Sequence, residues 1–230
     1  LISKGYRVGI ISQPDVNSSD DIMRLGEPLL FWGVTSGCVD SMVSNYTALK
    51  KRRRDDDLTP GGINDRRPDR ALIVYTGLIR RFFKNTVPIV LGGIEASLRR
   101  IAHYDYWDDS VRRPLIFDAK ADALVYGMGE KAILEFADAV KNNNDYNMIK
   151  GMCVISKEPV DGYITLAPYE KAAENSKTFS DMFMTAYRNN DPITASGMCQ
   201  KVGERWLIHN PPQPLPTTKE LDSIYELDFE

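Results

Sequence analysis

Apolar residues in the first part of the chain come in short continuous runs, and each run ends in glycine or in small polar residues. Four such runs are residues 6–12, 29–37, 87–91 and 121–127. Strands of a parallel sheet that is covered on both faces have this continuous pattern, whereas strands with one face in water alternate apolar and polar residues. The pattern therefore predicts four buried, parallel strands.

Between these runs the apolar residues recur every three or four positions, as in amphipathic helices. We expect helices from Cys38 on, over 70–84 with Asp69 as its cap, over 94–103 and over 130–141. Strand and helix thus alternate four times, and crossovers between parallel strands are right-handed. Residues 1–145 are therefore predicted to form an α/β domain with an open, doubly wound, mostly parallel sheet.

One stretch of this region has no periodicity. Residues 50–70 read KKRRRDDDLTPGGINDRRPDR, five basic residues followed by aspartates and a Pro-Gly-Gly turn. We expect a long exposed loop, which is either a solvated connection or a functional loop.

After residue 145 the pattern changes. We expect strands at 151–156 and 162–167, a helix over 167–191 and a hairpin that turns near Gly203. Residues 146–210 are therefore predicted to form a small α+β annex. Residues 211–230 are proline-rich and predict a linker that leads away from the domain.

Composition narrows the class of protein. The chain is 43% hydrophobic and 27% charged with a net charge of -3, which argues against a general nucleic-acid binder. No apolar run approaches the length of a membrane span, and no signal peptide is visible. The three cysteines have no zinc or iron-sulfur spacing and indicate reduced thiols, so we expect a cytoplasmic protein. The sequence LISKGY at the start suggests a helix that runs into a strand, so we also expect that the first strand of the sheet is missing.

Candidate binding residues lie at the strand ends, because ligands of open parallel sheets bind outside the carboxyl ends of the strands. Glycine there lets the backbone approach a ligand closely or adopt positive φ, and a following helix offers free N–H groups. The alternative is a set of tight turns, and neither GxGxxG nor GxxxxGK[ST] occurs. The four exits are Gln13, Pro14, Asp15; Thr35, Ser36, Gly37; Gly92, Gly93, with Glu95 beyond; and Gly127, Gly129, Glu130.

Charged residues near the second glycine pair are candidates for anion or substrate contacts. Guanidinium groups suit carboxylates and phosphates, which favours Arg99 and Arg100, and His103 follows closely. The alternatives are surface ion pairs with aspartate for the arginines and a packed corner for the histidine. The other arginine pairs are Arg66–Arg67, Arg80–Arg81 and Arg112–Arg113.

At these residues the chain resembles a known family. It is similar, through most of residues 1–145, to the amino-terminal region of the YgiQ-type bacterial radical SAM proteins. The motifs are RPDRALIVYTGLIRRFFK, VPIVLGGIEASLRRIAHYDYWDDSVRR and KADALVYGMGE. More loosely, IVLGGIEAS and ADALVYGMGE resemble strand ends of cobalamin-binding-like (flavodoxin-like) domains that precede radical SAM barrels.

The resemblance implies a [4Fe-4S] cluster and SAM in the parent protein, held outside this chain, with cobalamin as a further possible cofactor. The motif CxxxCxxC, which would hold the cluster, is absent here, and so is DxHxxG, the cobalt-ligating motif of classical cobalamin domains. We therefore expect an amino-terminal domain that covers the mouth of a downstream barrel and shapes its substrate or cofactor pocket. No catalytic residue and no metal ligand is expected in this chain. The alternative is a non-catalytic module that docks a protein or RNA through the arginine pairs.

Overall fold

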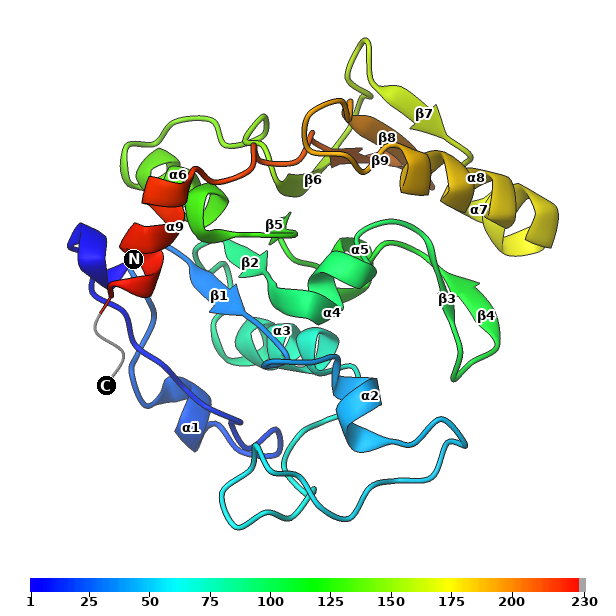
Figure 1. Cartoon of the computed structure of the whole chain (residues 1–230). Helices are drawn as coiled ribbons and strands as arrows, with labels where there is room; N and C mark the ends of the chain where they lie inside the picture. Colours follow the sequence, from blue (N-terminus) through cyan, green and yellow to red (C-terminus); the bar gives the residue numbers. More distant parts are fainter. Residues whose placement is uncertain (228–230) are drawn as a thin grey trace.

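A single mixed sheet forms the frame of the structure. In the computed structural model, which describes residues 1–227, seven strands run in the order β1 (Trp32–Val34), β2 (Ile89–Leu91), β5 (Ala123–Val125), β6 (Met152–Ser156), β9 (Arg205–His209), β8 (Met198–Val202) and β7 (Ile164–Leu166) (Figure 1). The first three strands are parallel neighbours. The next three are antiparallel, and β7 pairs in parallel with β8. The predicted α/β class is confirmed, and the strands expected for the annex extend the same sheet.

Helices and one hairpin connect and cover these strands. The helices are α1 (Asp20–Met23), α2 (Ser41–Asn45), α3 (Ala71–Phe82), α4 (Gly93–Leu98), α5 (Leu115–Ala119), α6 (Glu130–Lys141), α7 (Tyr169–Glu174), α8 (Ser176–Arg188) and α9 (Thr218–Tyr225), with a 3-10 turn at Ile2–Lys4. The hairpin consists of β3 (His103–Asp105) and β4 (Ser110–Arg112). No helix among residues 1–227 is long and apolar enough to cross a membrane.

The two central parallel strands explain the continuous apolar pattern. Ile89 and Leu91 of β2 belong to a hydrophobic cluster with α3 and α5, whereas Val90 between them belongs to a second cluster with α6. Alternate residues of a strand point to opposite faces. Both faces of β2 are therefore buried, as the sequence pattern predicts.

Two predictions at the start of the chain and before α3 are wrong. Residues 6–12 form no strand, and Val8 and Ile10 are 43% and 78% exposed, because no described strand pairs with them. Asp69 does not cap α3. The residue before that helix is Arg70, in the left-handed conformation, and the Asp69 carboxylate instead accepts hydrogen bonds from Asn45 and Tyr46.

Two further segments differ from their predictions. The helix expected over 94–103 ends at Leu98, because the chain then turns into the β3–β4 hairpin. The extension after residue 210 runs back toward α6 instead of leading away, since Gln213 donates a hydrogen bond to Glu135 at 2.9 Å. This extension also contains α9, which begins with a Thr217–Glu220 capping box. The last part of the predicted linker, residues 228–230, lies outside the described residues.

Candidate functional site

Three of the four predicted strand exits lie at one edge of the sheet. Strands β1, β2 and β5 are parallel and in register, so the residues that follow them emerge side by side. These are Thr35–Gly37, Gly92–Gly93 and Gly127–Gly129. The fourth exit, Gln13–Asp15, is not at the end of a strand, because residues 6–12 form none. We call the three converging exits the rim.

The glycine pair at the rim has a local structural reason. Gly93 has a φ of +85°, and a Cβ on it would lie 2.6 Å from Oγ1 of Thr35. Only glycine allows β2 to turn into α4 while β1 ends so close to it. Gly92 is different, because it is extended and no atom lies within 4 Å of the place of its missing Cβ. The backbone at Gly92 therefore faces open space.

Side chains from α4 join two of the exits to each other and hold the start of α2. The Ser97 hydroxyl donates to the carbonyl of Gly93 at 2.9 Å and accepts from the N–H of Gly127 at 3.1 Å. Glu95 is only 1% exposed and accepts from the N–H of Ser41 at 2.8 Å. Glu95 therefore anchors the start of α2 and does not project into solvent from the rim.

Two other predicted residues at the rim, Ser36 and Glu130, differ in their exposure to solvent. Ser36 is buried, and its hydroxyl donates to the carbonyl of Val39 at 2.9 Å, which fixes the turn after β1. Glu130 is the first residue of α6 and is exposed. At the rim, Ser36 and Ser97 are therefore held by hydrogen bonds to the backbone, whereas Glu130 is exposed to solvent.

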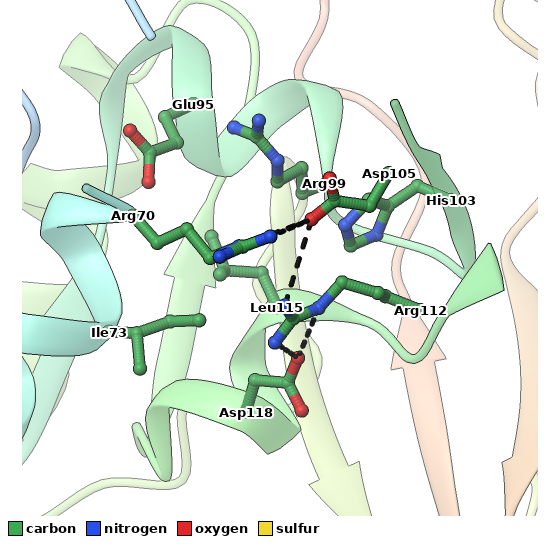
Figure 2. Close-up of a pocket in the computed structure, with 9 residues that line it drawn as sticks. All are labelled: Arg70, Ile73, Glu95, Arg99, His103, Asp105, Arg112, Leu115 and Asp118. Carbon is green, nitrogen blue, oxygen red and sulfur yellow. Dashed lines mark hydrogen bonds and ion pairs between the residues drawn. The ribbon is translucent and has the colours of Figure 1, made fainter. Parts of the chain in front are cut away.

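A small cavity lies next to the rim, and Figure 2 shows the side chains that point into it. Its free volume is about 10 Å³, which is the space of about one water molecule. Three predicted residues line it, although they come from different elements: Glu95, Arg99 and His103. The other residues around it are Arg112, which belongs to one of the arginine pairs, and five residues that no sequence pattern singles out: Arg70, Ile73, Asp105, Leu115 and Asp118.

The cavity is held together by a network of ion pairs (Figure 2). Asp105 accepts two hydrogen bonds from Arg70, at 2.9 and 3.1 Å, and its side chain is 7% exposed. Arg112 lies 3.6 Å from the same carboxylate and 2.9 Å from that of Asp118. Although burial alone raises the pKa of Asp105, the hydrogen bonds from Arg70 and from the N–H of Trp107 outweigh it and lower this pKa. The Asp105 carboxylate is therefore ionised, and its charge offsets those of the guanidinium groups of Arg70 and Arg112.

Two of the predicted cavity residues have defined states. The Nδ1 atom of His103 lies 3.2 Å from the carbonyl of Ile101, which places the proton on Nδ1. Burial lowers the pKa of His103 to about 4, so the imidazole is neutral at pH 7 and its Nε2 is an acceptor. Arg99 pairs with the buried carboxylate of Asp40.

Arg100, the other predicted anion contact, does not line this cavity. Its Nε donates to Nε2 of His209 at 2.9 Å, and its guanidinium lies 5.0 Å from the centre of the Tyr126 ring. A further hydrogen bond joins it to Asn190. Its polar atoms therefore already have partners within the protein.

The loop over residues 50–70 contains the buried polar groups that sequence reasoning missed. Arg67 and Asp56 form an ion pair at 3.0 Å, with both side chains almost completely buried. Asn64 donates to the carbonyls of Asn45 and Arg53, which joins the loop to α2. The loop has little regular secondary structure, as predicted, but it is anchored to the protein interior. The alternation of Asp, Arg and Asn among turn residues was the only signal for this in the sequence.

The described residues do not fit a metal centre. No group of three or more His, Cys, Asp or Glu residues among them is placed to hold a metal ion. Cys38 is exposed and alone, and burial raises the pKa of the Cys153 thiol to about 12, which keeps it protonated. These cysteines therefore do not fit the thiolate ligands of an iron-sulfur cluster. The two histidines do not fit a cobalt ligand either, because His209 is buried against Arg100 and His103 faces a cavity too small for a corrin.

The fold is an α/β domain in which the exits of three parallel strands share one edge of the sheet. Comparison with known proteins gives its family. A model described as Radical SAM N-terminal matches residues 1–230. The chain belongs to this family, which confirms the resemblance to radical SAM proteins.

Relatives with curated sequences agree. A UPF0313 protein of Fusobacterium nucleatum is 54% identical over 230 residues, which are all of this chain and 40% of that protein. A UPF0313 protein of Thermotoga maritima is 50% identical over 234 residues, covering 100% of this chain and 41% of its own length. A UPF0313 protein of Geobacter sulfurreducens is 46% identical over 232 residues, which are 98% of this chain and 38% of that protein. The chain thus spans about two fifths of the length of these relatives.

A solved structure is also similar in part. It is the radical S-adenosylmethionine methyltransferase TsrM from Kitasatospora setae, with tryptophan substrate and a SAM analog bound. The match is 24% identical with a TM-score of 0.35, and it covers 54% of this chain and 17% of that one.

Proposed function

We propose that this chain is the amino-terminal domain of a radical SAM enzyme and that its rim forms one wall of the pocket for substrate or cofactor. The observation that carries this proposal is the convergence of three glycine-rich exits from parallel strands at one edge of the sheet. In open parallel sheets this edge is where ligands bind. Family membership supplies the radical SAM context.

The rim and the cavity have different parts in this proposal. At the rim, the bare backbone of Gly92 and the exposed exits offer a surface that a ligand can approach closely. Behind it, the ion pairs of Arg70 and Arg112 with Asp105 hold α3 and the β3–β4 hairpin against each other. The rim therefore rests on a rigid base, which is what a preorganised binding surface needs.

The radical chemistry itself belongs to the rest of the polypeptide. When bound there, a [4Fe-4S] cluster with SAM would supply the 5′-deoxyadenosyl radical. The residues of this chain would contact the partner barrel and the bound molecule and would exclude water. Glu95 would position α2, and His103 would offer a neutral acceptor beside the guanidinium of Arg99.

The alternative of a docking module for protein or RNA has less support. Such a module needs free guanidinium groups, but Arg80 pairs with Asp122 and Arg113 pairs with Asp118. Most of the arginine pairs thus already contact carboxylates or buried groups. Counterion release on RNA binding requires cations that are free to meet phosphates.

Substitutions at Gly92 in the full-length protein test the proposed role of the rim. Gly92→Ala and Gly92→Leu fill the open space above the rim without a strained φ. Gly77→Ala is the matched control, because Gly77 also has nothing within 4 Å but lies on α3, away from the rim. The readouts are cluster absorbance, melting temperature, and 5′-deoxyadenosine formed from SAM after reduction.

We expect Gly92→Leu to change the rate of 5′-deoxyadenosine formation at least about 3-fold, which is a transition-state difference of about 0.65 kcal/mol. Cluster content and melting temperature should stay as in the unsubstituted protein. Equal rates in both variants would reject the rim as a pocket wall. A full-length protein without a cluster and without SAM cleavage would reject the radical SAM assignment itself.

A further inference from the structure

The sheet ends in an open edge at β7. Among the described strands, β7 pairs only with β8, and the N–H of Ile164 donates to the carbonyl of Gly197 at 2.9 Å. Alternate residues of a parallel strand bond on opposite sides. The N–H and C=O of Thr165 therefore point away from β8, and Thr165 is exposed. A strand edge of this kind can accept a further strand.

A groove lies beside this edge, between β7 and α8 (Figure 1). Its free volume is about 240 Å³, whereas that of the cavity next to the rim is about 10 Å³. On the β7 side it is lined by Thr165 and Leu166, and on the α8 side by Asp181 and Met182, among others. The groove is therefore large enough to hold a side chain, and it adjoins the open edge.

The combination of an open strand edge and a neighbouring helix is suited to an extended peptide segment. In this mode of recognition the backbone of the segment bonds to the edge strand, and pockets beside the edge take alternate side chains. Successive side chains of a strand point to opposite faces, so every second side chain of the segment would face α8. Thr165 would supply the backbone groups here, and the groove would take the side chain.

The lining of the groove indicates which side chain fits. Asp181 supplies a carboxylate, and none of the described residues that line the groove is basic. Lys177 pairs with Asp181 at 2.9 Å, but the Lys177 side chain is 82% exposed, and surface pairs contribute little to stability. Leu166 and Met182 offer apolar surface to methylene groups. The lining therefore fits lysine or arginine, which have an apolar stem and a cationic end.

We propose that an extended segment from the rest of the polypeptide adds to the open edge of β7 and places a lysine or arginine side chain in this groove. The chain covers 40% and 41% of the relatives from Fusobacterium nucleatum and Thermotoga maritima, so a protein of that length has further polypeptide for this segment. The three residues of β7 offer few backbone bonds. A tethered segment can bind through so few bonds because its effective concentration is high, whereas a separate peptide would bind weakly.

A second copy of the chain fits this edge less well. A two-fold axis beside Thr165 would pair β7 with β7 of the other copy. Because Asp181 lies in the same groove as Thr165, the two Asp181 carboxylates would then approach each other, and like charges at an interface are unfavourable. The proposed strand addition does not depend on the proposed function of the rim.

Hydrogen exchange of the full-length protein tests the strand addition at one amide. The N–H of Ile164 bonds to Gly197 in any case and is the internal reference. We expect the amide of Thr165 to exchange at least about 100-fold more slowly than in an unstructured peptide, at every protein concentration. Fast exchange at Thr165 would overturn the proposal. Protection that is lost on dilution would assign the edge to a second copy and would overturn it as well.

Two substitutions on α8 test the charge of the inserted side chain. Asp181→Lys places a cation in the groove, whereas Ser180→Lys places one on a neighbouring exposed residue that does not line it. Both positions are exposed, so both variants should fold. We expect the Thr165 amide to exchange at least about 10-fold faster in Asp181→Lys than in Ser180→Lys, because the groove would then repel the cationic side chain. Equal exchange at Thr165 in the two variants would overturn the proposal.

Discussion

The buried histidine of β9 makes the stability of this domain sensitive to acid. His209 is 3% exposed, and its Nε2 accepts a hydrogen bond from Arg100, so the ring is neutral. Burial, with the positive charge of Arg100 as a second cause, lowers the pKa of His209 from 6.5 to about 3. Between these two values only the unfolded chain binds the proton. Stability is therefore complete above pH 6.5 and is lost as the pH falls toward 3.

The size of the effect follows from the pKa difference. Each pH unit between the two pKa values contributes about 1.4 kcal/mol, so His209 should lower the free energy of opening by about 2 kcal/mol between pH 7 and pH 5. In hydrogen exchange this equals about a 30-fold change in the opening equilibrium. The suitable comparison is His209→Gln, because glutamine can accept from Arg100 and does not titrate.

The assay is native-state hydrogen exchange of amides in β6 and β9 of the full-length protein at pH 7 and pH 5, corrected for the intrinsic pH dependence of exchange. His103 is present in both proteins, so its own contribution cancels. We expect the opening free energy of the unsubstituted protein to fall by about 2 kcal/mol more than that of His209→Gln. If both proteins lose the same amount, His209 is not a buried neutral histidine and the reasoning fails.

Three further substitutions test the rim, the cavity and the last helix. Gly93→Ala should lower the free energy of unfolding by about 1–2 kcal/mol in chemical denaturation, because alanine is strained at positive φ. Asp105→Asn should lower it by about 2–4 kcal/mol, because Arg70 and Arg112 lose their shared carboxylate. Thr217→Ala should lower the stability of α9 by about 1 kcal/mol, because the Thr217 hydroxyl caps the N-terminus of that helix. Faster amide exchange in α9 would show this loss.

Each of these predictions has a matched control. Gly92→Ala has room and an extended backbone, so it should melt like the unsubstituted protein, and equal destabilisation at both glycines would contradict the φ argument. Asp109→Asn changes an exposed carboxylate that accepts a hydrogen bond from Tyr104, and an effect as large as that of Asp105→Asn would count against the ion-pair network. Thr217→Ser keeps the capping hydroxyl and should leave α9 unchanged.

The sequence predicts the central strands and long helices well because local pattern and burial agree there. The helix at 130–141 has the predicted bounds, and β2 lies within 87–91. Residues 6–12 have the local pattern of a strand, but a strand also needs a neighbour to bond with. Pattern alone cannot show whether that neighbour is present.

The sequence predicts only the part of the candidate site that follows from the order of strands and helices. Parallel strands necessarily bring their exits together, so the rim could be predicted from glycines and small polar residues. The cavity depends on the ion pair of Arg70 with Asp105, which are 35 residues apart in the sequence, and no periodic pattern links them. The sequence also could not show that the Arg100 side chain bonds to His209, because the two residues are more than a hundred positions apart.

The antiparallel pairing of β5 with β6 has a practical consequence. Ala123 faces Val154, and Val125 faces Met152, in the middle of the sheet. A shortened protein that stopped at residue 145 would present the bare side of β5, an apolar ribbon with open hydrogen-bonding groups, to the solvent. Such a fragment would be prone to aggregate, so a truncated form of this protein should keep β6 and β9 together with the parallel strands.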